Sequence, residues 1–257
     1  MIVTRRFDGA YLRADLVSAG HRRLVVSFDW RVIGRSGFTD MTPNPRFLAA
    51  GYDQLMIGTA ANDWFVNADT RALETALAPV AQDYDQVLGI GFSMGGYGAV
   101  RFSRKLRINR IVAVSPQVSI SHIHAPFEWR YREEAVGFDA ALGDLTTTAD
   151  PALAGHILLD DLNAADLAHG KALQRLCPRL RLVRLTGGGH PAVGVLREAK
   201  RAGRVQGLLL DPDAGLRPLL DDHRAGRGGQ QDYWSRLARG LDRNHPVCAA
   251  KARERTR

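Results

Sequence analysis

The sequence predicts an α/β fold in which a mostly parallel sheet carries helices on both faces. Short apolar runs alternate along the chain with segments whose apolar residues recur at helical spacing, which is typical of such a sheet. Residues 86–92 form an almost continuous apolar run, as in a strand buried on both faces. One long segment, residues 116–155, interrupts the alternation, and we interpret it as a small lid insertion after the strand at 110–115.

Each element follows from a local pattern. Asp8-Gly9 supplies turn chemistry for an N-terminal hairpin. Residues 69–84 predict a helix because Leu73, Leu77 and Val80 share one face, and Asp69 is a candidate cap at its start. The predicted hairpin spans residues 2–17, the strands 23–29, 54–58, 86–92, 110–115, 156–160 and 180–185, and the helices 69–84, 94–106, 166–176 and 191–201.

The chain of 257 residues is long enough for one substantial core. We expect a single domain over residues 1–247, with the insertion at 116–155 and further helices in 207–247. Residues 248–257 are expected to be a frayed basic tail.

Composition excludes several classes of protein. With 45% hydrophobic and 24% charged residues, the chain is neither disordered nor collagen-like. Its two cysteines have no CxxC spacing, so we predict no zinc site and no redox pair. The net charge of +8 suits an anionic substrate, a nucleic acid or an anionic surface, and equally suits arginine used for solubility. We find no helix-turn-helix, zinc or RNP pattern and expect no nucleic-acid partner.

The N-terminus becomes charged before any apolar run develops, so it does not resemble a secretory signal. No stretch approaches the roughly 20 apolar residues that a membrane helix needs. We therefore expect a cytoplasmic protein without a membrane partner.

The stretch Gly91-Phe-Ser93-Met-Gly95 matches G-x-S-x-G between a predicted strand and a predicted helix. In this context the serine stands on a sharp turn, and side chains at positions 91 and 95 would collide. The Met94 N–H would then lie at a helix N-terminus, where it favours developing negative charge. The alternatives are a turn whose serine only caps the helix, and a nucleotide-binding loop, whose sixth position here is Met94 and not glycine.

A nucleophilic serine needs a base, and His190 is the best candidate among eight histidines. It directly follows Thr186-Gly-Gly-Gly189 and the strand at 180–185, and the glycines allow the loop to bend over the edge of the sheet. Pro191 suits the first position of the next helix. The alternative is a histidine that only caps this helix.

The base needs an orienting carboxylate, and Asp160, Asp161 and Asp166 all follow the strand before that of His190. We favour Asp160 because it ends the strand. Asp166 is the second choice and is equally suited to cap the helix at 166–176. Asp161 is most simply solvated, and the choice among the three stays open.

Other candidates lie at further strand ends. The second oxyanion donor is expected from the backbone of Asp29, Trp30 or Arg31, and we choose Trp30. Gln117 is a candidate for substrate binding, with a turn as the alternative. The Trp129–Arg132 cluster suits either a lid that meets an anion or an ordinary amphipathic surface.

On Gly91–Gly95, Thr186–His190 and the acidic segment between them, the chain resembles the α/β-hydrolase superfamily over about residues 20–203. The serine, acid and histidine also follow its usual chain order. The loop after residue 29 departs from the pattern, because Phe28-Asp-Trp-Arg31 replaces the usual His-Gly. Further segments, such as Ser93-Met-Gly-Gly-Tyr-Gly98, resemble a bacterial branch of this superfamily. Relatives of that branch occur among proteins of surface polysaccharide metabolism, so the resemblance implies sugar-linked esters as substrates.

We therefore predict a serine hydrolase that cleaves an ester or related acyl bond through an acyl-enzyme, without a metal or an organic cofactor. Its expected partner is a small-molecule or glycan-linked ester. The same residues suit an acyltransferase that acts on a sugar or polysaccharide hydroxyl. A third possibility is a non-catalytic binding module for an anionic polymer.

Overall fold

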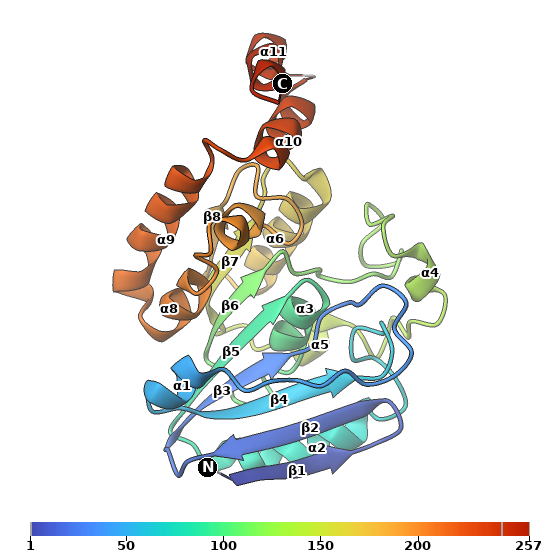
Figure 1. The fold of residues 1–257 in the computed structure, drawn as a ribbon. Coiled ribbons are helices and arrows are strands. Elements are labelled where there is room, and N and C mark those ends of the chain that lie inside the picture. Colours follow the sequence, from blue (N-terminus) through green and yellow to red (C-terminus); the bar gives the residue numbers. More distant parts are fainter. Residues whose placement is uncertain (1, 243, 257) are drawn as a thin grey trace.

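The structure, a computed structural model, describes residues 2–242 and 244–256. Its strands are β1 (Ile2–Asp8), β2 (Leu12–Ser18), β3 (Arg23–Phe28), β4 (Asp53–Thr59), β5 (Gln86–Phe92), β6 (Arg110–Val114), β7 (Ala154–Leu159) and β8 (Leu180–Arg184). They form one sheet of order β1-β2-β4-β3-β5-β6-β7-β8 (Figure 1). The β1–β2 and β2–β4 pairs are antiparallel, and all other pairs are parallel. The predicted mostly parallel sheet is confirmed.

The helices are α1 (Pro45–Ala49), α2 (Thr70–Gln82), α3 (Met94–Arg101), α4 (Arg132–Ala135), α5 (Leu145–Thr148), α6 (Ala164–Leu176), α7 (Gly194–Glu198), α8 (Arg204–Leu210), α9 (Pro212–Gly226), α10 (Gln231–Leu241) and α11 (Pro246–Glu254). One face of the sheet packs on α2, α3 and α6, and the other packs on α1, α7, α8 and α9 (Figure 1). Helices therefore cover both faces, as the sequence predicts.

The predicted strands match the observed ones to within about two residues, and the 2–17 hairpin is β1–β2. The helix predicted at 191–201 is wrong at its start, because α7 begins at Gly194 and Pro191 lies before it. Asp69 is the N-cap residue of α2, as predicted, but its side chain makes no capping hydrogen bond. Its carboxylate instead accepts the N–H groups of Tyr11 and Leu12 at 2.6 and 3.1 Å, which ties the hairpin to α2.

Residues 116–155 connect β6 to β7 and contain only the short helices α4 and α5. The segment is anchored on α3, where the Tyr97 hydroxyl donates to the carbonyl of Gly143 at 2.8 Å and Arg101 donates to that of Leu142 at 3.1 Å. Because it leaves β6 at the carboxyl edge of the sheet, it lies over the site described below. Its action as a lid stays a prediction.

The C-terminal residues differ from expectation. Residues 246–254 form helix α11, in which Ala249 and Ala252 are buried, so the frayed tail is corrected over this stretch. Helices α10 and α11 pack together at the end of the molecule where β8 forms the edge of the sheet (Figure 1). Within residues 2–242 and 244–256, none of the helices combines the length and the apolar character that crossing a membrane requires.

Candidate active site

Ser93 stands at the sharp turn between β5 and α3, with a φ of 49°, which is unusual for a residue other than glycine. A Cβ atom at Gly91 would lie 2.0 Å from the carbonyl oxygen of Gly95. One at Gly95 would lie 2.6 Å from that of Asp29 and 2.7 Å from that of Phe28. The turn can therefore form only with glycine at both positions, as the motif predicts.

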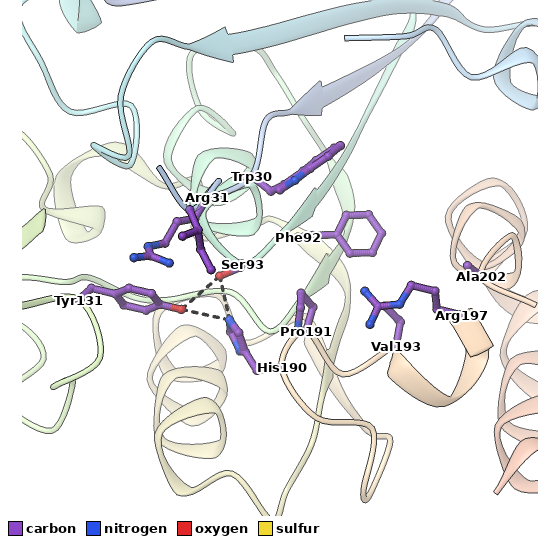
Figure 2. Close-up of a pocket in the computed structure, with 11 residues that line it drawn as sticks. Trp30, Arg31, Phe92, Ser93, Tyr131, His190, Pro191, Val193, Arg197 and Ala202 are labelled. Carbon is purple, nitrogen blue, oxygen red and sulfur yellow. Dashed lines mark hydrogen bonds between the residues drawn. The ribbon is translucent and has the colours of Figure 1, made fainter. Parts of the chain in front are cut away.

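Ser93 and His190 are brought together by two loops at the carboxyl edge of the sheet (Figure 2). The Ser93 Oγ atom lies 2.9 Å from His190 Nε2, and His190 Nδ1 lies 2.8 Å from Asp166 Oδ2. Asp166 is buried, and the side chain of His190 is 22% exposed. Because Asp166 accepts a hydrogen bond from the Nδ1–H group, Nε2 carries the lone pair that can accept a hydrogen bond from the Ser93 hydroxyl. The three side chains form a continuous chain of hydrogen bonds.

The preference for Asp160 over Asp166 is corrected by this geometry. The Asp160 carboxylate is buried beneath the loop that carries His190. It accepts the N–H groups of Gly187 and Gly189 at 2.9 and 2.8 Å and that of Leu162 at 3.1 Å. Its oxygens are therefore used to shape the glycine loop, and Asp160 supports His190 through the backbone alone. Burial raises the pKa of Asp160 above its ordinary value.

Asp166 lies in the first turn of α6 but does not cap it. Asn163 is the cap, and its side chain accepts the N–H of Asp166 at 3.2 Å. The Asp166 carboxylate is therefore free to meet His190 with Oδ2 and Arg130 with Oδ1, the latter at 2.7 Å. Burial alone would raise the pKa of Asp166, but the hydrogen bond and charge of His190, with those of Arg130, outweigh it. The pKa lies below its ordinary value, so the carboxylate stays ionised near neutral pH.

Arg130 belongs to a network that sequence reasoning missed. Its guanidinium bridges Asp166 and Glu128, with a shortest distance of 2.6 Å to Glu128. Glu128 also accepts from His169 Nε2 at 2.8 Å, while His169 Nδ1 accepts the N–H of Val118 at 3.1 Å. Asp166 and His169 are three residues apart on α6 and so face the insertion together. No local motif in the sequence marks this pairing across distant segments.

Tyr131, in the same segment, places its hydroxyl 3.1 Å from His190 Nε2 and 3.4 Å from Ser93 Oγ (Figure 2). Its ring packs against Trp64 at a centroid distance of 4.7 Å. Burial raises the pKa of Tyr131. The hydroxyl is thus neutral and lies beside Ser93 Oγ and His190 Nε2. Sequence analysis singled out the Trp129–Arg132 cluster but gave Tyr131 no role of its own.

Gln117 lies behind Ser93, where it is fully buried, and is not among the residues that line the pocket. Its amide Nε2 donates to Ser93 Oγ at 3.3 Å and to the carbonyl of Ser115 at 3.0 Å, and its Oε1 accepts from Trp64 Nε1 at 2.9 Å. The contact with substrate predicted for Gln117 is therefore replaced by a contact with the serine hydroxyl.

The candidate backbone donors lie at the start of α3 and in the loop after β3. Met94 opens α3, and its N–H has no acceptor among the residues that the structure describes. The Trp30 N–H, chosen from the sequence as the second donor, is already engaged by the Asp29 carboxylate at 2.8 Å. The Asp29 N–H donates to the carbonyl of Ile57 at 3.0 Å. Of the three loop candidates, only the Arg31 N–H has no acceptor within the described part of the chain.

The hydroxyl of Ser93 opens into a pocket of about 460 Å³. Most of its lining is apolar, with Arg31 near Ser93 and with the Arg197 side chain beside Val193, pointing toward Pro191 (Figure 2). Arg31 pairs with Glu134 at 2.5 Å. Arg197 has no ion pair among the described residues. The lining residues are Trp30, Arg31, Ile33, Phe92, Ser93, Tyr131, His190, Pro191, Val193, Arg197 and Ala202.

The sequence matches no protein-family model and no curated protein. The solved structures that are similar to this one in fold include the following two. A mutant of the capsule O-acetyltransferase of Neisseria meningitidis serogroup A, in complex with CoA, has a TM-score of 0.51 at 16% identity, over 77% of this chain and 93% of that chain. Est1E from Butyrivibrio proteoclasticus has a TM-score of 0.51 at 15% identity, over 82% of this chain and 99% of that chain. With the sheet order and the turn at Ser93, these likenesses give the protein an α/β-hydrolase-like fold.

Proposed function

We propose that this protein is a serine hydrolase that cleaves an ester or related acyl bond through an acyl-enzyme. One observation carries the proposal: Ser93, His190 and Asp166 form a hydrogen-bonded chain at a turn that exposes the serine hydroxyl to a pocket. The same arrangement supports catalysis on unrelated folds, so the argument rests on geometry and not on fold. This hydrogen-bonded chain also disfavours a non-catalytic binding module, because such a module does not require an imidazole hydrogen-bonded to a serine.

In the first step Ser93 Oγ attacks the substrate carbonyl while its proton passes to His190 Nε2. The bond between the carbonyl carbon and the leaving group then breaks, and His190 returns that proton to the leaving group. An acyl-Ser93 ester remains. Water enters, gives a proton to His190, attacks the ester and releases the acid with regeneration of Ser93. Asp166 holds the imidazole and stabilises its protonated form throughout.

Negative charge develops on the carbonyl oxygen in each step and needs donors that are already in place. The Met94 N–H at the start of α3 is the first donor, since the helix dipole adds to its effect. The second oxyanion donor is the Arg31 N–H or the Tyr131 hydroxyl. It is not the Trp30 N–H, because that group already donates to Asp29. A Tyr131→Phe variant separates these two.

A second function, acyl transfer to a sugar hydroxyl, is favoured by Trp30. This residue lines the pocket and is 56% exposed, and a flat exposed aromatic ring is well suited to stack on a sugar. One of the similar structures is named as a capsule O-acetyltransferase. Hydrolysis and transfer share the acyl-enzyme and differ only in whether water or an alcohol resolves it.

Labelling with a fluorophosphonate probe tests the proposed nucleophile. The wild-type protein should be labelled on Ser93, and Ser93→Ala should not be labelled. Ser103→Ala is a matched control, because Ser103 is a buried serine that donates to a backbone carbonyl. Labelling that persists in Ser93→Ala would remove Ser93 from its role. Acyl release measured with and without added sugars then separates hydrolysis from transfer.

A further inference from the structure

A second cavity, of about 500 Å³, lies at the edge of the sheet opposite to Ser93. Ser93 and His190 follow the carboxyl ends of β5 and β8, whereas this cavity is built at the amino ends of β6, β7 and β8. Strands of five or six residues separate the two edges by roughly 17–20 Å. The lining residues are Arg110, Ala154, Gly155, His156, Pro178, Arg179, Arg181, Pro212, Asp213 and Leu216.

The sheet register brings three basic side chains to one face at this edge. His156 of β7 lies directly opposite Arg181 of β8 and opposite Val112 of β6. Arg110 is two residues before Val112 and therefore shares its face. This is the face that α8 and α9 cover, since Val112 packs in the same cluster as residues of both helices. Arg179, just before β8, adds a fourth basic group.

The three arginine side chains at this cavity are not paired with carboxylates. Among the ion pairs of the described residues, none involves Arg110, Arg179 or Arg181. Asp213 is the one carboxylate in the lining, and it is not within ion-pair distance of them. Like charges held together around a hollow repel one another, and a bound anion would relieve that repulsion.

His156 is the buried member of the group, at 6% exposure. Its Nδ1 is buried and has no hydrogen-bond partner in the described structure. Nε2 is therefore the ring nitrogen that can bind a ligand. Arg110 Nε is likewise buried without a partner, which leaves the terminal nitrogens of its guanidinium for the cavity. Burial lowers the pKa of His156, and the charges of Arg181 and Arg110 lower it further. The charge of Asp213 raises it but does not outweigh them, so the arginine charges act on His156.

We infer that this cavity binds the phosphate group of a small phosphorylated molecule. Guanidinium groups match phosphate oxygens with paired hydrogen bonds, and three of them stand around the hollow with the imidazole of His156. The volume falls in the range of sites for whole small molecules, so it has room for the group to which the phosphate is attached. The inference is independent of the proposed reaction at Ser93.

Titration with inorganic pyrophosphate at constant ionic strength tests the inference, with calorimetry and the NMR signals of the His156 ring as readouts. The wild-type protein should bind saturably and shift those signals. The double variant Arg179→Ala/Arg181→Ala, in which both residues are exposed, should lose at least about tenfold in affinity, which is 1.4 kcal/mol.

The matched control is Arg5→Ala/Arg6→Ala. It removes the same charge from two exposed positions on β1, at the edge of the sheet opposite to β8. Its affinity should stay within about twofold of wild type, since distant exposed charges are screened. Equal losses in both double variants, or a shift of His156 that never saturates, would overturn the inference, because only general charge attraction would then remain. Fluorophosphonate labelling of Ser93 should be the same in all three proteins.

Discussion

Arg130 Nη1 donates to Asp166 Oδ1 at 2.7 Å, on the oxygen that His190 does not use. The Asp166 carboxylate is therefore held at both ends, and its orientation toward His190 is fixed. The insertion between β6 and β7 supplies Arg130, while α6 supplies Asp166. The insertion that contributes Tyr131 to the pocket lining thus also holds the carboxylate that contacts His190.

This contact determines how an amide would be placed in the Asp166→Asn variant. The amide oxygen would face the donor Arg130, and the NH₂ group would face His190 Nδ1, so the proton of the imidazole would move to Nε2. Nε2 could then no longer accept the proton of Ser93. We expect kcat to fall by a factor on the order of 10⁴, with the fold intact. Steady-state kinetics with a p-nitrophenyl ester measures this loss.

Asp160→Asn is the matched variant. Its amide nitrogen would face a backbone N–H of Gly187 or Gly189, and the loss of one such bond costs about 1–3 kcal/mol of stability. We expect a lower melting temperature but much more residual kcat than in Asp166→Asn. The reverse order of the two kcat values would assign the acid role to Asp160.

Glu128 should make the protein sensitive to acid. Burial alone would raise its pKa, but the hydrogen bonds of His169 and Arg130 outweigh burial and lower the pKa to about 2. A pKa lowered by folding stabilises the protein above the ordinary pKa of the group, and this stabilisation is lost as pH falls toward the folded value. From pH 5 to pH 2, Glu128→Gln should therefore lose less free energy of unfolding than wild type, by on the order of 3 kcal/mol.

Urea denaturation across this pH range measures the difference. Glu133→Gln is the control, because Glu133 is exposed in the same segment. Equal pH slopes in wild type and Glu128→Gln would contradict the assigned role of the Glu128 network.

Tyr131→Phe removes the hydroxyl near Ser93 Oγ and His190 Nε2 without changing the ring that packs on Trp64. If this hydroxyl stabilises the oxyanion, kcat should fall by about 10²–10³ with little change in KM. Tyr97→Phe is the control, because it removes a buried tyrosine hydroxyl that donates to Gly143. An unchanged kcat in Tyr131→Phe would leave the Arg31 N–H as the second donor.

Arg197 should select acyl groups that end in a negative charge. Its guanidinium points toward Pro191 beside Val193, so only apolar lining separates it from Ser93 (Figure 2). A charge-assisted hydrogen bond is worth about 1.5–3 kcal/mol, so Arg197→Gln should lose at least about tenfold in kcat/KM for half-esters of dicarboxylic acids. Neutral esters of equal length should be unaffected. The control is Arg201→Gln, because Arg201 is a neighbouring exposed cation outside this pocket, and this variant should leave both rates unchanged. Equal losses of kcat/KM for both kinds of ester in Arg197→Gln would contradict the predicted selection.

The sequence carried enough information for the sheet and for the Ser93–His190 pair. Apolar runs and helical spacing are local signals. The G-x-S-x-G motif and the glycines before His190 mark turns where the backbone has no room for a side chain or needs a positive φ. These features depend on residues that are close in the chain.

The acid and its supports depend on contacts between distant segments. Asp160 was preferred because it ends its strand, but its carboxylate bonds the backbone of the glycine loop instead. Asp166 reaches His190 because Asn163 caps α6 in its place. Arg130 and Tyr131 lie in an insertion without regular spacing, so no periodic pattern could predict where they meet the site.

The central claim is that Ser93, activated by His190, carries the acyl group. The most direct test is rapid quenching of the reaction with p-nitrophenyl acetate, followed by mass spectrometry of the peptide that contains Gly91–Gly95. We predict an acetyl group on Ser93 that forms with a burst of p-nitrophenol in wild type and is absent in both Ser93→Ala and His190→Ala. Turnover that continues in folded Ser93→Ala, or an acetyl group found only on another residue, would contradict the account.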